Sequence, residues 1–184
     1  PEEGVLLSAP TGTGKTLVAE AAVYEALHTG KVCYYSTPLI ALTDQKFLEL
    51  QDTLARWGYD RDQVGLVTGH RSVNPHAPVK VVVAEVLLNR LLHPEAFDMS
   101  NVASVVMDEF HYYADPDRGW AWQVPLLELP QAQMVLLSAT LGDVSFFVRD
   151  LRERTGREVA VVDDAVRPVP LEMEYVVEPI GELL

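Results

Sequence analysis

Short apolar runs rich in β-branched residues alternate along the chain with longer stretches in which apolar residues recur at helical spacing. The short runs predict strands near residues 4–9, 31–36, 64–67, 79–84, 102–108, 133–138 and 158–163. The longer stretches predict helices near residues 15–28, 42–56, 85–92, 119–128 and 143–154. Apolar strands that alternate with helices are typical of α/β proteins. The pattern therefore predicts a mostly parallel sheet with helices on both faces.

Two stretches interrupt this alternation. Residues 70–78 contain prolines and an asparagine and predict a loop. Residues 163–170 resemble a linker, and residues 171–177 after them alternate as a strand would. We therefore expect one domain over residues 1–163, and a linker with the first strand of a second domain over residues 164–184. The first strand begins so early that we expect the domain to be truncated at its N-terminus.

A glycine-rich turn follows the first predicted strand and leads into the first predicted helix. It comprises Ala9, Pro10, Thr11, Gly12, Thr13, Gly14, Lys15 and Thr16. A turn of this kind presents successive backbone N–H groups to a phosphate, and glycine removes the side chains that would block the path. The first position departs from the P-loop pattern because it is alanine and not glycine. The strand, turn and helix together nevertheless predict a nucleoside triphosphate site.

Two side chains of this turn have direct roles in such a site. Lys15 places a positive charge at the β- and γ-phosphates, and the hydroxyl of Thr16 can ligate Mg²⁺. The N-terminus of the helix adds its partial positive charge. The sequence thus predicts a nucleoside triphosphate and Mg²⁺ as cofactors, and the family resemblance described below implies that the nucleotide is ATP.

An acidic pair, Asp108 and Glu109, follows the apolar run 102–107. Ligands of open α/β sheets collect at the carboxyl ends of the strands, so this position suits a catalytic site. We expect Asp108 to hold Mg²⁺ and Glu109 to orient the attacking water. For an isolated pair, capping of the next helix is the alternative. The upstream P-loop favours the catalytic interpretation.

A third strand, near residues 133–138, runs into Ser138, Ala139 and Thr140. Their hydroxyls would lie at the same sheet edge, within reach of the γ-phosphate or of His111. An ordinary Ser/Thr turn at a helix entry is the alternative for this tripeptide in isolation.

The three segments together resemble motifs I, II and III of superfamily 2 helicases in the DExH form, with His111 completing motif II. Residues 37–42, with Gln45 and Lys46, resemble motif Ia, and residues 84–89 resemble the Ib element. Residues 111–130 resemble the stretch that follows motif II in superkiller-type (Ski-like) RNA helicases. The resemblance extends over most of the chain.

This resemblance implies a RecA-like P-loop NTPase domain that couples ATP hydrolysis to movement on, or unwinding of, a nucleic acid. It implies that Lys15, Asp108, Glu109, His111, Ser138 and Thr140 are catalytic. It also implies that the sugar-phosphate backbone is held by Thr37, Pro38, Leu39, Ala41, Gln45, Glu85 and Asn89. Helix N-termini, hydroxyls and backbone amides are suitable phosphate donors.

The resemblance also implies two partners. One is a second RecA-like domain of the same chain, which would supply the arginine finger, so the isolated fragment is expected to hydrolyse ATP poorly. The other is single-stranded nucleic acid, with RNA favoured over DNA by the resemblance alone. A small P-loop kinase and a nucleotide-binding interaction module without catalysis remain alternatives, although no arginine-rich lid of a kinase is evident.

Charge and cysteine content refine this hypothesis. The formal net charge of −13 disfavours a general affinity for nucleic acids, so any such partner needs a local binding face. The single cysteine, Cys33, lies in a predicted strand and can form no disulfide within the chain, and the scattered histidines have no zinc-ligand spacing. No apolar run approaches the roughly 18 residues of a membrane span. We therefore expect a cytoplasmic protein with no membrane partner.

One tryptophan has the spacing of a core residue. Trp122 falls in helical register with Leu126 and Leu129, which predicts burial, whereas base stacking is the alternative for an aromatic residue of a nucleic-acid-binding protein.

Overall fold

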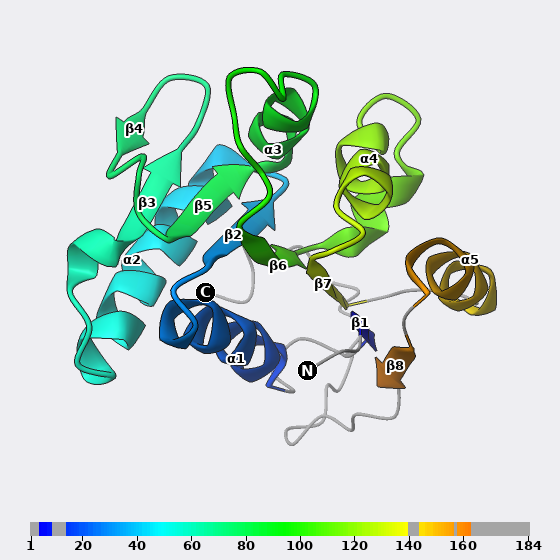
Figure 1. Cartoon of the computed structure of the whole chain (residues 1–184), viewed down its shortest axis with the longest axis horizontal. Coiled ribbons are helices and arrows are strands. Elements are labelled where there is room, and N and C mark those ends of the chain that lie inside the picture. Colours follow the sequence, from blue (N-terminus) through cyan, green and yellow to red (C-terminus); the bar gives the residue numbers. More distant parts are fainter. Residues whose placement is uncertain (1–3, 9–13, 140–143, 157, 163–184) are drawn as a thin grey trace, which may run out of the picture.

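The computed structural model describes residues 4–8, 14–139, 144–156 and 158–162, and within these ranges the chain forms one mixed sheet flanked by helices (Figure 1). The strands are β1 (Gly4–Ser8), β2 (Val32–Thr37), β3 (Val64–Val67), β4 (Ser72–Val73), β5 (Val79–Val83), β6 (Val102–Met107), β7 (Gln133–Ser138) and β8 (Val159–Val162). The α-helices are α1 (Lys15–His28), α2 (Ile40–Arg56), α3 (Ala84–Leu91), α4 (Trp120–Glu128) and α5 (Ser145–Thr155). Two 3₁₀ helices, η1 (Arg61–Gln63) and η2 (Phe110–Ala114), complete the described elements.

The strand order is β4-β3-β5-β2-β6-β7-β1-β8. Every strand pair is parallel except β3 with β4, which is antiparallel. The predicted α/β fold with a mostly parallel sheet is therefore confirmed. Each predicted strand agrees with the observed strand to within one residue at either end.

The prediction of a loop over residues 70–78 is wrong in one part, because Ser72 and Val73 form β4. Val73 pairs with Leu66 and Ser72 with Val67, which closes an antiparallel ribbon at the edge of the sheet. A strand of two residues is too short to show an alternation of apolar and polar positions, so the prediction followed the prolines of this stretch.

Helix α2 begins at Ile40, two residues earlier than the sequence predicts. Leu39 has an extended backbone, and its carbonyl accepts hydrogen bonds from the amide and from the hydroxyl of Thr43. These bonds form the first turn, so the helix starts immediately after the Pro38-Leu39 segment.

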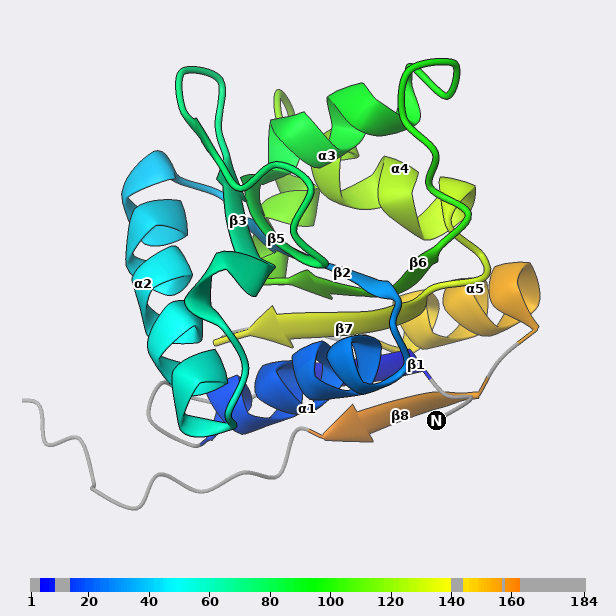
Figure 2. The same cartoon turned by 60° about the vertical axis from the view of Figure 1, so that its left-hand side comes forward.

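The sheet separates two hydrophobic cores. Helices α1 and α2 cover one face, and α3, α4 and α5 cover the other (Figures 1 and 2). Successive residues of β2 point to opposite faces, so Cys33 and Tyr35 pack under α1 and α2 while Tyr34 packs under α3. Helices on both faces, as predicted, explain why the central strands are apolar on both sides.

Cys33 is fully buried, and this burial raises the pKa of its thiol to about 12, so the thiol stays protonated and unreactive. Among the described residues, no helix combines the length and the apolarity that a bilayer crossing requires.

Candidate functional site

The carboxyl ends of three neighbouring strands meet at one edge of the sheet. Strands β6, β7 and β1 lie side by side (Figure 1), and their pairing is parallel. The register pairs Ser8 of β1 with Ser138 of β7, and Met107 of β6 with Leu136 of β7. Three chain segments therefore leave the sheet at the same edge, and they carry the residues for which the sequence predicts chemistry.

The first segment leads from β1 into α1. The predicted P-loop residues Ala9, Pro10, Thr11, Gly12 and Thr13 lie outside the described residues. Gly14 has a φ of 91°, a left-handed conformation that favours glycine, and Lys15 is the first residue of α1. Thr16 is exposed, and the first turn of the helix contains no acidic residue. The N-terminus of α1 therefore offers its amides and a positive side chain without a competing carboxylate.

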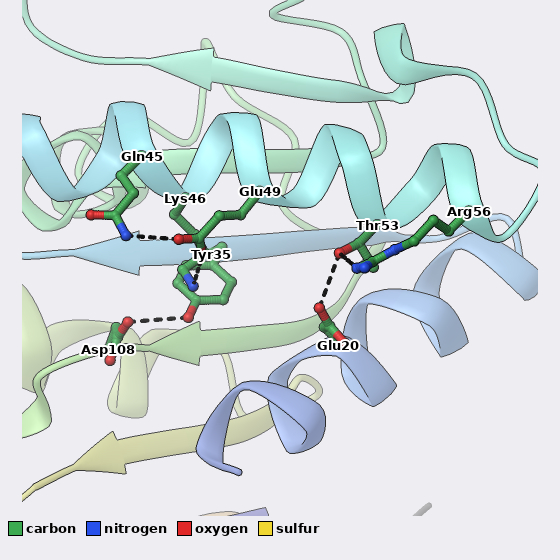
Figure 3. A network of polar contacts seen from close by, with 8 residues as sticks. All are labelled: Glu20, Tyr35, Gln45, Lys46, Glu49, Thr53, Arg56 and Asp108. Carbon is green, nitrogen blue, oxygen red and sulfur yellow. Dashed lines mark hydrogen bonds and ion pairs between the residues drawn. The ribbon is translucent and has the colours of Figure 1, made fainter. Parts of the chain in front are cut away.

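The second segment begins with Asp108, directly after β6. Its amide donates a hydrogen bond to the carbonyl of Ser36 in β2 (2.9 Å), which extends the ladder between the two strands by one residue. The hydroxyl of Tyr35 donates to Oδ2 of Asp108 (3.1 Å; Figure 3). The amide of Glu109 donates to Oδ1 of the same carboxylate (2.9 Å). Both carboxylate oxygens are thus held by the protein. Burial, followed by the charge of Asp108, raises the pKa of Tyr35 well above its usual value, so the phenol remains a donor.

Glu109 follows in a left-handed backbone conformation, with a φ of 51°. Few residues other than glycine adopt this conformation, and it often marks a functional turn. It turns the chain into η2 and brings Oε2 of Glu109 to 3.3 Å from Nδ1 of His111. The same nitrogen lies 3.5 Å from the hydroxyl oxygen of Ser138 at the end of β7. Three predicted site residues, from the segments after β6 and β7, therefore form one polar cluster; Thr140 lies outside the described residues.

The oxygen atoms at this edge suit magnesium. Asp108 offers a carboxylate and Thr16 a hydroxyl, and hard oxygen ligands are those that Mg²⁺ prefers. Within the described residues, no group of three or more His, Cys, Asp or Glu side chains could hold a metal alone. Mg²⁺ usually completes its shell with water and substrate phosphates, so a few protein oxygens are sufficient.

The predicted nucleic-acid residues lie on a different part of the same edge, between β2, α2 and α3. Thr37 is buried, and its hydroxyl contacts Oγ1 of Thr43 (2.7 Å) and the carbonyl of Leu39 (3.2 Å). The Thr37 hydroxyl therefore has two internal partners in this structure, and its role as a phosphate donor stays a prediction. Its role in this structure is to order the entry to α2.

The other candidates of the first segment differ in exposure. Leu39 is half exposed and Ala41 is exposed, whereas Pro38 is buried. Gln45 is exposed, and its amide donates to Oε1 of Glu49 one turn later (2.7 Å; Figure 3). These residues leave a surface at the start of α2 that consists of backbone, small and apolar groups together with the amide of Gln45.

Arg118 connects the two predicted nucleic-acid segments, a role that the sequence did not reveal. Its Nε donates to Oε1 of Glu85 in α3 (2.6 Å), and its Nη2 donates to the carbonyl of Pro38 (2.7 Å). Glu85 is thus engaged in an ion pair. Asn89, one turn further along α3, lines with Glu85 and Ile40 a groove with a volume of about 460 Å³.

A tight turn after η2 sets the position of Arg118. Oδ1 of Asp115 accepts hydrogen bonds from the amides of Asp117 and Arg118, both 2.9 Å. At Gly119 an added Cβ would lie 2.2 Å from the carbonyl oxygen of Tyr113, so only glycine fits there. The conformation of this turn therefore depends on residues close to Arg118 in the sequence. The residues that the Arg118 side chain contacts are distant in the sequence.

Two tryptophans near the start of α4 differ in burial. Trp122 is completely buried, which confirms its predicted place in the core, and its ring stacks on Tyr112 at 5.5 Å between centroids. Trp120, two residues earlier, is 62% exposed.

Comparison with known proteins identifies the kind of domain that carries this site. A family model described as "DEAD/DEAH box helicase" matches residues 1–146. The chain is 46% identical over 169 residues to "Probable helicase HelY" of Mycobacterium leprae, an alignment that covers 91% of this chain and 18% of that protein. It is 37% identical over 172 residues to "ATP-dependent RNA helicase mtr4" of Schizosaccharomyces pombe, with 93% and 15% covered.

The yeast relative "Antiviral helicase SKI2" of Saccharomyces cerevisiae is 34% identical over 172 residues, with 93% of this chain and 13% of that protein covered. The chain thus spans less than a fifth of the length of these relatives. Among solved structures, the helicase domain of Pyrococcus furiosus Hef is similar, with a TM-score of 0.68 and 22% identity over 95% of this chain and 38% of that one. This likeness supports the fold.

Proposed function

Because this chain belongs to the DEAD/DEAH box helicase family and its relatives include superkiller-type helicases, we propose that it is the first of two RecA-like domains of an ATP-dependent helicase or translocase. In this proposal residues 1–163 form the ATP-binding domain, and residues 164–184 lead into the second. The observation that carries the proposal is the shared edge at which β1, β6 and β7 deliver Lys15, Asp108 and Ser138.

The proposed chemistry is attack of water on the γ-phosphorus of ATP: the water oxygen bonds to phosphorus, the bond to the β,γ-bridging oxygen breaks, and ADP, phosphate and a proton are released. The amides of the P-loop and Lys15 bind the phosphates. Thr16 and Asp108 would hold magnesium, which would neutralise charge on the phosphate oxygens. Glu109 orients the water, and its contact with His111 limits the positions that its carboxylate can take. His111, Ser138 and Thr140 link this site to the segment after β7.

The proposed nucleic-acid path crosses the edge between α2 and α3. The candidates that reach the surface there are Leu39, Ala41, Gln45, Glu85 and Asn89, and backbone groups near Pro38 complete the set. A local face of this kind is compatible with a strongly acidic domain, because amides and helix N-termini bind phosphates without net positive charge. We propose single-stranded RNA in preference to DNA on the basis of relatives that are named RNA helicases.

A steady-state ATPase assay on the full-length protein, with and without single-stranded RNA or DNA, tests the proposal. We expect nucleic acid to stimulate phosphate release severalfold and the isolated domain to remain slow. The Lys15→Ala variant is the control for contaminating ATPases. Hydrolysis that is indifferent to both polymers would contradict a helicase and favour a kinase, and an absence of hydrolysis would indicate a binding module.

Replacement of Arg118 by lysine tests the proposed path. Lysine keeps the positive charge but lacks the planar guanidinium that donates to Glu85 and to the carbonyl of Pro38 at the same time. We expect the affinity of the full-length protein for single-stranded RNA to fall by about three- to tenfold. Fluorescence anisotropy with a labelled RNA oligonucleotide measures this affinity.

Arg61→Lys is the matched control, because Arg61 forms an exposed ion pair with Asp52 and contacts neither segment of the path. Equal affinities for Arg118→Lys and Arg61→Lys would show that the connection between the two segments does not contribute to binding.

A further inference from the structure

Tyr35 contacts the candidate magnesium ligand from a neighbouring strand. Tyr35 in β2 pairs with Val106 in β6, and both side chains lie on the face covered by α1 and α2. Asp108 is two residues beyond Val106 and so falls on the same face. Two residues of a strand advance about 7 Å, which the length of a tyrosine side chain can span. The hydroxyl consequently reaches Oδ2 of Asp108 at 3.1 Å.

This hydroxyl completes the set of donors that fix the carboxylate. The amide of Glu109 already holds Oδ1, but one hydrogen bond leaves the plane of the carboxylate free to rotate about its Cβ–Cγ bond. The second bond, from Tyr35 to Oδ2, removes this rotation. The remaining lone pairs of both oxygens then have defined directions.

Tyr35 is itself held in place. Only 2% of its surface is exposed, and Nζ of Lys46 in α2 lies 5.5 Å from the centre of its ring (Figure 3). Lys46 is paired with Glu49 at 2.5 Å, so its position over the ring is also fixed. The ring therefore has no room to turn away from Asp108.

We propose that Tyr35 is a positioning residue for the magnesium site: its hydroxyl orients the carboxylate of Asp108 toward the metal that accompanies ATP. This inference rests on the proposed function, because it assumes that Asp108 is a ligand. It adds a residue that lies outside the helicase motifs and belongs to the strand before motif Ia. Tyr35 touches neither the metal nor the nucleotide and acts only through Asp108.

The test measures metal affinity in the full-length protein with a bound non-hydrolysable ATP analogue. Mn²⁺ replaces Mg²⁺, and electron paramagnetic resonance counts free and bound metal. The Tyr35→Phe variant keeps the ring and removes one oxygen. We expect its Mn²⁺ affinity to fall by about five- to tenfold, which is less than the full effect of a hydrogen bond to a charged group because Tyr35 acts on the metal only through Asp108. Binding of the analogue in EDTA should not change, which also verifies that the variant is folded.

Tyr34→Phe is the matched control. Tyr34 is the adjacent residue, is equally buried, and uses its hydroxyl as an acceptor for Arg90 on the opposite face of the sheet (2.7 Å). We expect its Mn²⁺ affinity to remain within twofold of the unaltered protein. A Tyr35→Phe variant that binds Mn²⁺ with unchanged affinity would overturn the proposal. Tighter binding would do so as well, because the hydroxyl would then compete with the metal.

Asp108→Asn separates this inference from the proposed function. If Asp108→Asn weakens Mn²⁺ binding and Tyr35→Phe does not, only the positioning role of Tyr35 is wrong. If Asp108→Asn also binds Mn²⁺ normally, the magnesium site of the proposed function is wrong.

Discussion

A Glu109→Gln substitution in the full-length protein is expected to lower kcat for ATP hydrolysis by at least about 100-fold. Glutamine has the same shape but cannot accept a proton or polarise the attacking water. The left-handed backbone at position 109 and the 3.3 Å contact with His111 define where this side chain acts. The affinity for nucleotide should stay within about threefold, since the proposed phosphate-binding groups are Lys15 and the P-loop and not Glu109.

Phosphate release and the binding of a fluorescent nucleotide are the two measurements for this variant. Glu128→Gln, at the exposed end of α4, is a control for the loss of one negative charge. A Glu109→Gln protein that hydrolyses ATP at the normal rate would show that another group orients the water. A protein that loses nucleotide binding as well would show that Glu109 supports the fold of the site.

The sequence predicted the elements of this fold well because their patterns are local. A buried parallel strand such as β6 is apolar at nearly every position, and α1 follows a glycine-rich turn that signals its start. The location of Asp108 was predictable for the same reason, since it directly follows such a strand. Neither prediction required knowledge of the strand order.

Contacts between distant segments were not predictable in this way. Tyr35 and Asp108 are 73 residues apart, and Arg118 is 80 residues from Pro38. In the sequence, Tyr35 is one of two adjacent tyrosines in a strand, and alternation of side chains does not reveal which of them shares a sheet face with Asp108. Arg118 belongs to a polar turn that could equally face solvent. Only the strand order and the packing of α4 against α3 bring these residues to their partners.

The Thr37 prediction shows a different limit. A hydroxyl near a helix N-terminus is a suitable phosphate donor, and the sequence contains no sign that a second hydroxyl, that of Thr43, takes it as a partner. The competition between a ligand and an internal hydrogen bond depends on side-chain direction. Residues at the entry to a helix therefore need a structure before their hydroxyls are assigned to a ligand.

Trp122 joins the core to the segment that carries Arg118. Its indole is fully buried, stacks on Tyr112, and lies under the Arg118 guanidinium at 5.7 Å. Its Nε1 is buried without a hydrogen-bond partner, so the contribution of Trp122 to stability comes from its ring and not from its N–H group. Loss of this ring would leave a large cavity between α4 and the sheet, because few neighbours can move to fill it.

We therefore expect Trp122→Ala to lower the free energy of unfolding of this domain by about 3–5 kcal/mol. Urea denaturation followed by circular dichroism measures the change. Trp122→Phe keeps a stacked ring and removes the unpaired N–H, so it should lower the free energy of unfolding by only about 1 kcal/mol. Trp120→Ala removes the same side chain from the same helix where it is 62% exposed, and its effect should be below about 1 kcal/mol. Equal losses for Trp122→Ala and Trp120→Ala would mean that the packing of α4 on the sheet does not stabilise the domain.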